Sequence, residues 1–96
     1  MAIGLIVRVK VVAGKGPAFE AAFAEQAKAV RANEPGNKLY QLVRSRGDAD
    51  GYVVMELYDN EDALEAHRTA EHMVANRPRT AGLVAPGTTV EIYDAV

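Results

Sequence analysis

The sequence has no cysteine, no tryptophan and only two histidines. Without cysteine there can be no disulfide, thiolate nucleophile or cysteine metal site, and two histidines are too few for an ordinary structural zinc site. The glycines at Gly14 and Gly16 are too few to form a phosphate-binding loop. We therefore expect no metal and no other cofactor, and the lack of cysteine fits a reducing, cytoplasmic location.

The chain also lacks long hydrophobic runs and a strong charge of either sign. Its apolar start is interrupted by Arg8 and Lys10 and has no basic segment before it, so it resembles neither a signal peptide nor a membrane span. The net charge is −2, which provides no overall field for nucleic acid or an anionic membrane. We expect a single domain over residues 1–96, whose core is small enough for oligomerisation to add stability.

The periodicity of apolar residues predicts four strands and two helices. Alternation indicates strands over residues 3–11, 39–46, 52–58 and 88–93. Helical spacing begins at Pro17 and should end at Pro35 and Gly36, where Gly36 can adopt a positive φ. A second helix should begin after a cap at Asp59 or Asn60, run towards Met73 or Val74, and be broken by Asn76-Arg-Pro-Arg79, with a short turn to Leu83 as the alternative to a complete stop.

The order β-α-β-β-α-β predicts a ferredoxin-like α+β fold, an antiparallel four-stranded sheet with its helices on one face. The opposite face of such a sheet is usually polar in a monomer. Here Val53, Met55 and Leu57 alternate with the equally apolar other side of their strand, and Ile6 adds to the open face. Two apolar faces predict a homodimer in which the open faces pack together.

A carboxylate, Glu56, lies in the middle of an apolar strand, and His67 lies on the apolar side of the next helix. A lone buried charge costs several kcal/mol, so such a group requires a partner or a function. We expect Glu56 to orient His67, which would act as a general base or proton shuttle. The alternative is a purely structural buried pair.

Several short segments resemble the antibiotic biosynthesis monooxygenase domain family. The resemblance spans about Ile3 to Ile92 and rests on Asn33-Glu-Pro-Gly-Asn37, Tyr40, Glu56-x-Tyr58, Ala63-Leu-Glu-Ala-His67 and His72. It implies a small homodimer with a dimeric α+β barrel. It also implies oxidation of quinols or phenols by O₂ without flavin, haem or metal. The family includes an isomerase of a phosphorylated sugar and haem-degrading relatives. The latter carry a tryptophan, which this chain lacks.

Four further residues are candidates for substrate binding. Tyr40 and Tyr58 should lie opposite one another if Arg46 pairs with Tyr52, and they could stack on an aromatic ligand or donate to its oxygen. The resemblance places Asn33 near the pocket mouth, although turn formation is its simplest role. His72 lies about 140° around a helix from His67, which predicts a position at the pocket edge.

These observations lead to one functional hypothesis and its alternatives. The hypothesis is a cofactor-independent monooxygenase that oxidises a small hydroxylated aromatic, with His67 and Glu56 as catalytic residues. One alternative is an isomerase or lyase acting on a small oxygenated metabolite, in which Arg44 or Arg46 would hold an anion. Another is a non-enzymatic ligand-binding protein. Phe19 and Phe23, four residues apart on the first helix, should pack in the core or line the pocket.

Overall fold

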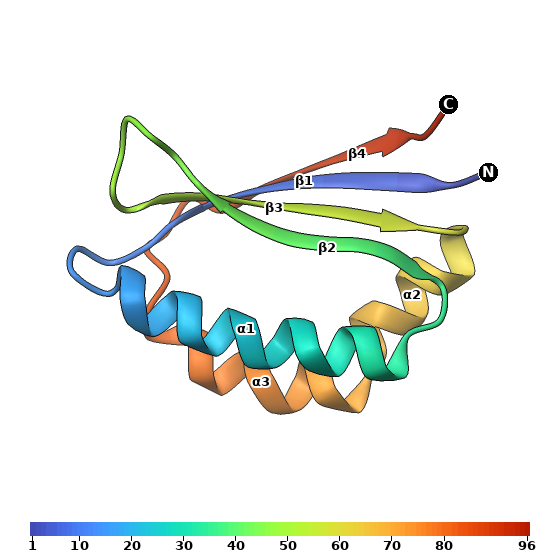
Figure 1. Ribbon diagram of the computed structural model, residues 1–96, viewed down its shortest axis with the longest axis horizontal. Helices are drawn as coiled ribbons and strands as arrows, with labels where there is room; N and C mark the ends of the chain where they lie inside the picture. The colour runs from blue at the N-terminus through green and yellow to red at the C-terminus, as the bar shows by residue number, and fades with distance from the viewer.

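The computed structural model describes residues 1–96. Its elements follow the order β1 (Ile3–Lys10), α1 (Gly16–Asn33), β2 (Asn37–Arg44), β3 (Gly51–Tyr58), α2 (Glu61–Thr69), α3 (Glu71–Ala81) and β4 (Thr89–Asp94). The strands form one antiparallel sheet in the order β2-β3-β1-β4. Figure 1 shows two layers, with every helix on the same side of the sheet. The ferredoxin-like α+β fold is confirmed.

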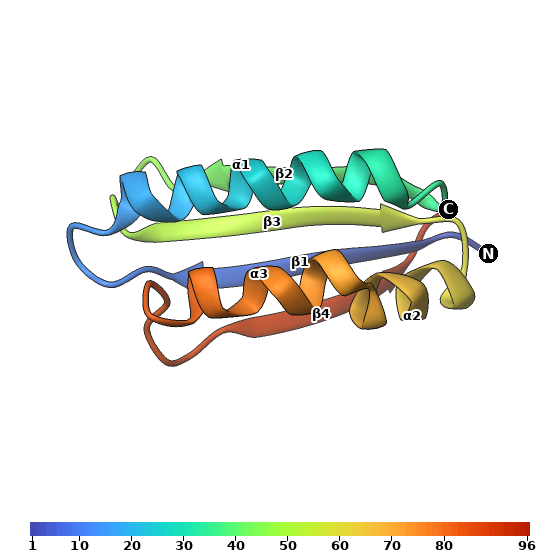
Figure 2. The same cartoon turned by 90° about the horizontal axis from the view of Figure 1, so that it is seen from below.

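The helices lie nearly along the strands and share the lower face of the sheet between them. Viewed from the helix side, α1 lies over the β2 and β3 half, and α3 with α2 lies over the β1 and β4 half (Figure 2). None of the helices is both long enough and apolar enough to cross a membrane. Because the helices cover the sheet in two rows, side chains from both rows and from the sheet meet between the two layers.

The hairpin of β2 and β3 has a different register from the expected one. Arg44 pairs with Tyr52, and Tyr40 pairs with Glu56 rather than with Tyr58. The connection between Arg44 and Tyr52 therefore runs from Ser45 to Gly51, and within it the Asp48 carbonyl accepts from the Gly51 N–H at 3.0 Å. The shift amounts to two residues, so each side chain keeps its predicted face of the sheet.

The second predicted helix is in fact two helices. α2 ends at Thr69, and α3 begins at Glu71 after an extended Ala70 with φ −62° and ψ 140°. The expected break at Pro78 is wrong, because Pro78 lies inside α3. The carbonyl that loses its N–H partner there belongs to Val74, a residue 51% exposed, so water can satisfy it. The predicted cap is confirmed at Asn60, whose side chain accepts from the Ala63 N–H at 2.9 Å.

The core lies between the helices and the sheet. Phe23 of α1 stacks on Tyr40 of β2 with ring centroids 4.9 Å apart, and Phe19 packs against Tyr52 at 5.2 Å. Alternate residues of β3 are buried on this side, as the pattern predicts. The predicted core positions of Phe19 and Phe23 are therefore confirmed.

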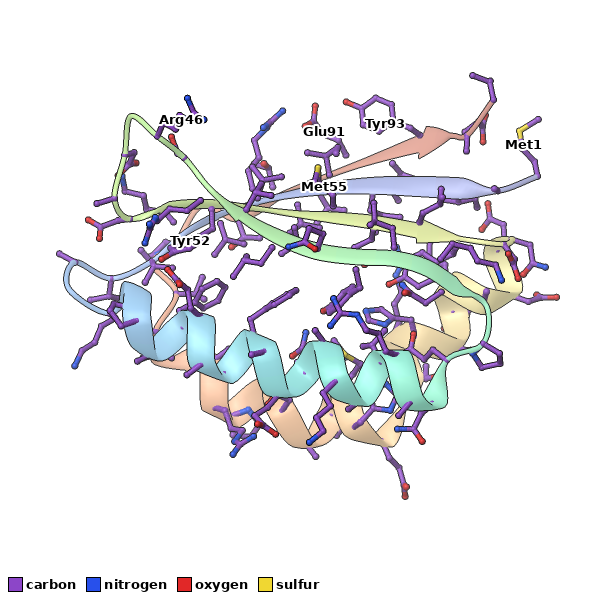
Figure 3. All side chains as sticks on the ribbon, viewed as in Figure 1. Met1, Arg46, Tyr52, Met55, Glu91 and Tyr93 are labelled. Atoms are coloured by element: carbon purple, nitrogen blue, oxygen red, sulfur yellow. The ribbon has the colours of Figure 1, made fainter.

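The other face of the sheet carries no helix. In Figure 3, Met55, Glu91 and Tyr93 point away from the helices, whereas Tyr52 points towards α1. Apolar side chains nevertheless continue across this face, and Leu39, Val43 and Tyr93 are 42%, 38% and 50% exposed. The register brings these residues together with Ile6, Val53, Met55 and Leu57. We call this set the open face.

Candidate functional site

The turn after α1 places Glu34 over α2. Pro35 disfavours a helical conformation at Glu34, which takes an extended φ of −121° and ψ of 86° and ends the helix. Gly36 does not have a positive φ, contrary to expectation. It is required instead by close approach, since a Cβ at this position would lie 2.6 Å from that of Ala63. The turn thus packs directly on the helix that carries His67.

His67 lies on the buried side of α2, and its ring bridges two carboxylates. Its Nδ1 lies 2.8 and 3.1 Å from the two carboxylate oxygens of Glu34, and its Nε2 lies 3.8 Å from Oε1 of Glu56. The His67 and Glu34 side chains are each 8% exposed. The hydrogen-bonding partner of His67 is therefore Glu34. The expectation that Glu56 orients the ring through a hydrogen bond is not met, because Glu56 faces the other nitrogen from beyond hydrogen-bond distance.

Glu56 is held by its neighbour on the same face of β3. The Tyr58 hydroxyl donates to Oε1 of Glu56 at 2.6 Å. Burial raises the pKa of Glu56, while the Tyr58 hydrogen bond and the nearby His67 act in the opposite direction. The pKa of the Tyr58 hydroxyl is also raised, first by burial and then by the Glu56 charge. Tyr58 therefore stays protonated and acts as a hydrogen-bond donor.

His72 reaches the same carboxylate from α3. Its Nε2 is hydrogen-bonded to Oε2 of Glu34, and its side chain is 17% exposed. The angular argument that separated His72 from His67 assumed one continuous helix. The break at Ala70 removes that assumption, and both histidines converge on Glu34. Sequence reasoning missed Glu34, although its position before a proline at a helix end was a usable signal.

Tyr40 borders His67 on its other side and belongs to a second hydrogen-bonded chain. Its ring centroid lies 5.4 Å from that of His67. The Gln26 amide donates to the Tyr40 hydroxyl, and Asn76 of α3 donates to the Gln26 carbonyl oxygen. Burial, and then the charge of Glu56, raise the pKa of Tyr40, so it also remains a neutral phenol. No pattern in the sequence singled out Gln26 or Asn76 as part of this site.

These residues surround a cavity of about 250 Å³ between the sheet and the helices. Its polar lining includes Gln26, Tyr40, Glu56 and His67, and its apolar lining includes Phe19, Phe23, Val54 and Met73. Thr80, Val84 and Thr88 line it where α3 gives way to β4. We call this space the cavity. It presents one imidazole, one carboxylate and one phenol to a ligand, together with the Gln26 amide and two threonine hydroxyls, within mostly apolar walls.

Three other predicted residues lie outside the cavity. Asn33 is exposed, and its side chain donates to the Ala29 carbonyl at 2.8 Å. Arg44 pairs with Glu20 at 3.1 Å on the outer side of α1 and β2, and Arg46 lies in the exposed turn beyond β2. No arginine lines the cavity. The structure therefore places no cationic side chain where an anionic substrate beside His67 would need one.

Fold and site together define a small α+β protein with an acid–base group in the wall of a cavity between the sheet and the helices. The family model for antibiotic biosynthesis monooxygenase matches residues 2–78. The chain belongs to this family. Membership indicates an enzyme with a monooxygenase-like activity.

Two relatives and one more distant structure are similar to this chain. A mycobilin-producing heme oxygenase from Mycobacterium tuberculosis is 31% identical over 88 residues, covering 92% of this chain and 83% of the relative. A Caulobacter crescentus CB15 protein assigned to the antibiotic biosynthesis monooxygenases is 37% identical, with a TM-score of 0.95 and coverage of 99% and 90%. SnoaB, a cofactor-independent oxygenase from Streptomyces nogalater, shares the fold with a TM-score of 0.84, 22% identity and coverage of 98% and 92%.

Proposed function

We propose that this protein is a cofactor-independent monooxygenase that oxidises a small hydroxylated aromatic with O₂. The observation that carries the proposal is His67 in the cavity wall. With Nδ1 donating to Glu34, the neutral ring presents an unprotonated Nε2 to the cavity. The surrounding walls are mostly apolar and aromatic, which suits a flat ring bearing one or two hydroxyl groups.

The first step is removal of the substrate's hydroxyl proton by Nε2 of His67. Glu34 holds the ring in place and stabilises the imidazolium that forms. The substrate's electron pair stays on its oxygen, next to the Tyr40 hydroxyl, which can donate to it. The apolar walls exclude water from the resulting electron-rich anion.

The second step is transfer of one electron from this anion to O₂, followed by combination of the two radicals at a ring carbon. The peroxide then takes up a proton and loses water as the ring carbon becomes a carbonyl. For 1-naphthol the balance is C₁₀H₈O plus O₂ giving C₁₀H₆O₂ plus H₂O. The substrate supplies all the electrons, so this chemistry requires no external reductant.

The mycobacterial relative makes haem a second candidate substrate. The cavity volume of about 250 Å³ lies below the range of about 300–1,000 Å³ typical of ligand pockets. This favours a substrate of one or two rings over a tetrapyrrole. Titration with haemin tests the second candidate, and a stoichiometric shift of the haemin absorbance band would favour it over the proposal.

Oxygen uptake with a panel of quinols and naphthols tests the main proposal. We expect one O₂ to be consumed per 1,4-naphthoquinone formed from 1-naphthol, without added metal, flavin or reductant. Naphthalene, which fills similar space but has no hydroxyl proton for His67 to remove, should give no O₂ uptake. Failure of every hydroxylated aromatic in the panel to support uptake would contradict the proposal.

We also propose that the protein works as a homodimer joined through the open face. Leu39, Val43 and Tyr93 are too exposed there for a monomer that must stay soluble without a partner. Met55→Glu, near the centre of this face, should shift the protein from dimer to monomer in sedimentation velocity at micromolar concentration. Val74→Glu, at a 51% exposed position on α3, is the control and should leave the dimer intact. A stable wild-type monomer would contradict the proposal.

A further inference from the structure

Each of the two histidines that share Glu34 lines a different hollow. The cavity includes His67 in its lining but not His72. A second hollow of about 370 Å³, between α1 and α3, is lined by Glu25, Gln26, Ala29, His72, Ala75, Asn76 and Arg79 and does not include His67. We call it the outer hollow. The two histidines thus face different spaces while sharing one carboxylate.

The groups between the two hollows form an unbroken series of hydrogen bonds. Nδ1 of His67 donates to Glu34 at 2.8 Å, and the other oxygen of Glu34 is hydrogen-bonded to Nε2 of His72. The exposed fractions of the side chains are 8% for His67, 8% for Glu34 and 17% for His72. The series therefore starts at the buried base and ends at the group with the best access to water.

We propose that His67, Glu34 and His72 form a path that carries protons between the cavity and the outer hollow. The inference rests on the proposed function, in which His67 takes a proton from the substrate. Each imidazole can accept a proton at one ring nitrogen and release one at the other, and a carboxyl group can do the same with its two oxygens. Three such groups in hydrogen-bonding order are sufficient for a relay.

One passage moves four protons by one bond each. The substrate's proton binds Nε2 of His67, and the Nδ1 proton moves to Glu34. The proton between Glu34 and His72, which at the start is on the Glu34 carboxyl group, moves onto Nε2 of His72, and Nδ1 of His72 releases a proton to water in the outer hollow. The His67 imidazolium is transient, and no buried group keeps an added charge after the passage, because each takes one proton and gives one up.

The passage leaves every hydrogen bond of the series reversed in direction. The series must therefore carry one proton in the opposite direction before the next turnover. The proposed reaction supplies that return, since its overall balance releases no proton and the peroxide needs one to leave as water. A proton taken up by His72 from solvent can reach the cavity through Glu34 and His67. The path is thus reset within one catalytic cycle.

His72→Gln is the variant that tests this path. The glutamine amide can still hydrogen-bond Glu34 but cannot pass a proton through itself. With 1-naphthol as the probe, turnover should fall about tenfold or more, and millimolar imidazole, which fits the outer hollow, should restore part of it. Arg79→Gln changes the same hollow outside the series and is the control, with turnover that should not respond to imidazole.

A second measurement does not depend on activity. Exchange of the His67 ring N–H with solvent, followed by ¹⁵N NMR of the protein without substrate, should be slower in His72→Gln than in wild type and unchanged in Arg79→Gln. Equal exchange in wild type and His72→Gln would overturn the path, as would a loss of turnover that imidazole cannot restore. If wild type consumes no O₂, the proposed function fails, but the exchange comparison still decides the path.

Discussion

A folded His67→Ala variant should lose turnover by about 10²-fold or more, because positioned general bases contribute on this scale. His67 is the imidazole in the cavity wall, and its Nδ1 is held by Glu34 at 2.8 Å. Replacement by alanine leaves no group in the same place that can accept the substrate's proton. Steady-state O₂ uptake with 1-naphthol measures the effect, which should appear mainly in kcat.

Folding and assembly must be checked before this result is interpreted. His67 is buried, so circular dichroism and sedimentation of the variant are needed alongside the kinetics. Arg68→Ala changes the next residue of α2, which is exposed, and should retain near wild-type turnover. Near-normal turnover in a folded His67→Ala protein would show that His67 is not the base. The chemistry would then have to come from Tyr40, Tyr58, His72 or the substrate itself.

Replacement of Glu56 by glutamine should lower turnover by about tenfold, less than loss of the base itself. Glu56 lies 3.8 Å from Nε2 of His67, so its charge stabilises the imidazolium that forms when this nitrogen takes a proton. Glutamine keeps the shape and can still accept from the Tyr58 hydroxyl. Glu56→Ala would be a poorer test because it also leaves a cavity in the core.

The same substitution should change how stability depends on pH. Burial raises the folded-state pKa of Glu56 above its ordinary value of 4.5. The stability linked to this group is therefore fully present below that ordinary value and is lost as the pH rises through the folded-state pKa. Glutamine does not titrate, so the melting temperature of Glu56→Gln relative to wild type should increase as the pH is raised from acidic to neutral.

Glu65→Gln provides the matching control for this pH series. Glu65 is an exposed carboxylate on α2, and its replacement should give a melting-temperature difference that varies little with pH. A difference for Glu56→Gln that stays constant or decreases towards neutral pH would contradict the assignment of Glu56 as a group that burial disfavours in its charged form. Unfolding followed by circular dichroism at several pH values is sufficient for both variants.

Much of the architecture could be predicted from local pattern. The alternation in residues 52–58 correctly identified which side of β3 is buried, because successive side chains of a strand point to opposite faces. That pattern also placed Glu56 and Tyr58 on the helix side, and the apolar stripe of α2 placed His67 opposite them. The family assignment followed from short motifs, and the match to residues 2–78 confirms it.

Local pattern was less reliable where a backbone choice depended on distant contacts. Pro78 was expected to end a helix but lies inside α3, where water can serve the exposed carbonyl of Val74. Gly36 was assigned a positive φ but is needed for its closeness to Ala63 of α2. Both errors arose because the environment that decides such positions is supplied by other elements of the fold.

The sequence by itself determined the succession of strands and helical segments, the buried side of β3 and the identity of the central imidazole, because these follow from periodicities of two and 3.6 residues. Only the tertiary structure decided which carboxylate holds that imidazole. Glu34 is 33 residues from His67 and 38 from His72 in the chain. Their convergence requires the Pro35 turn to pack on α2 and the helix to break at Ala70, and no local periodicity contains that information.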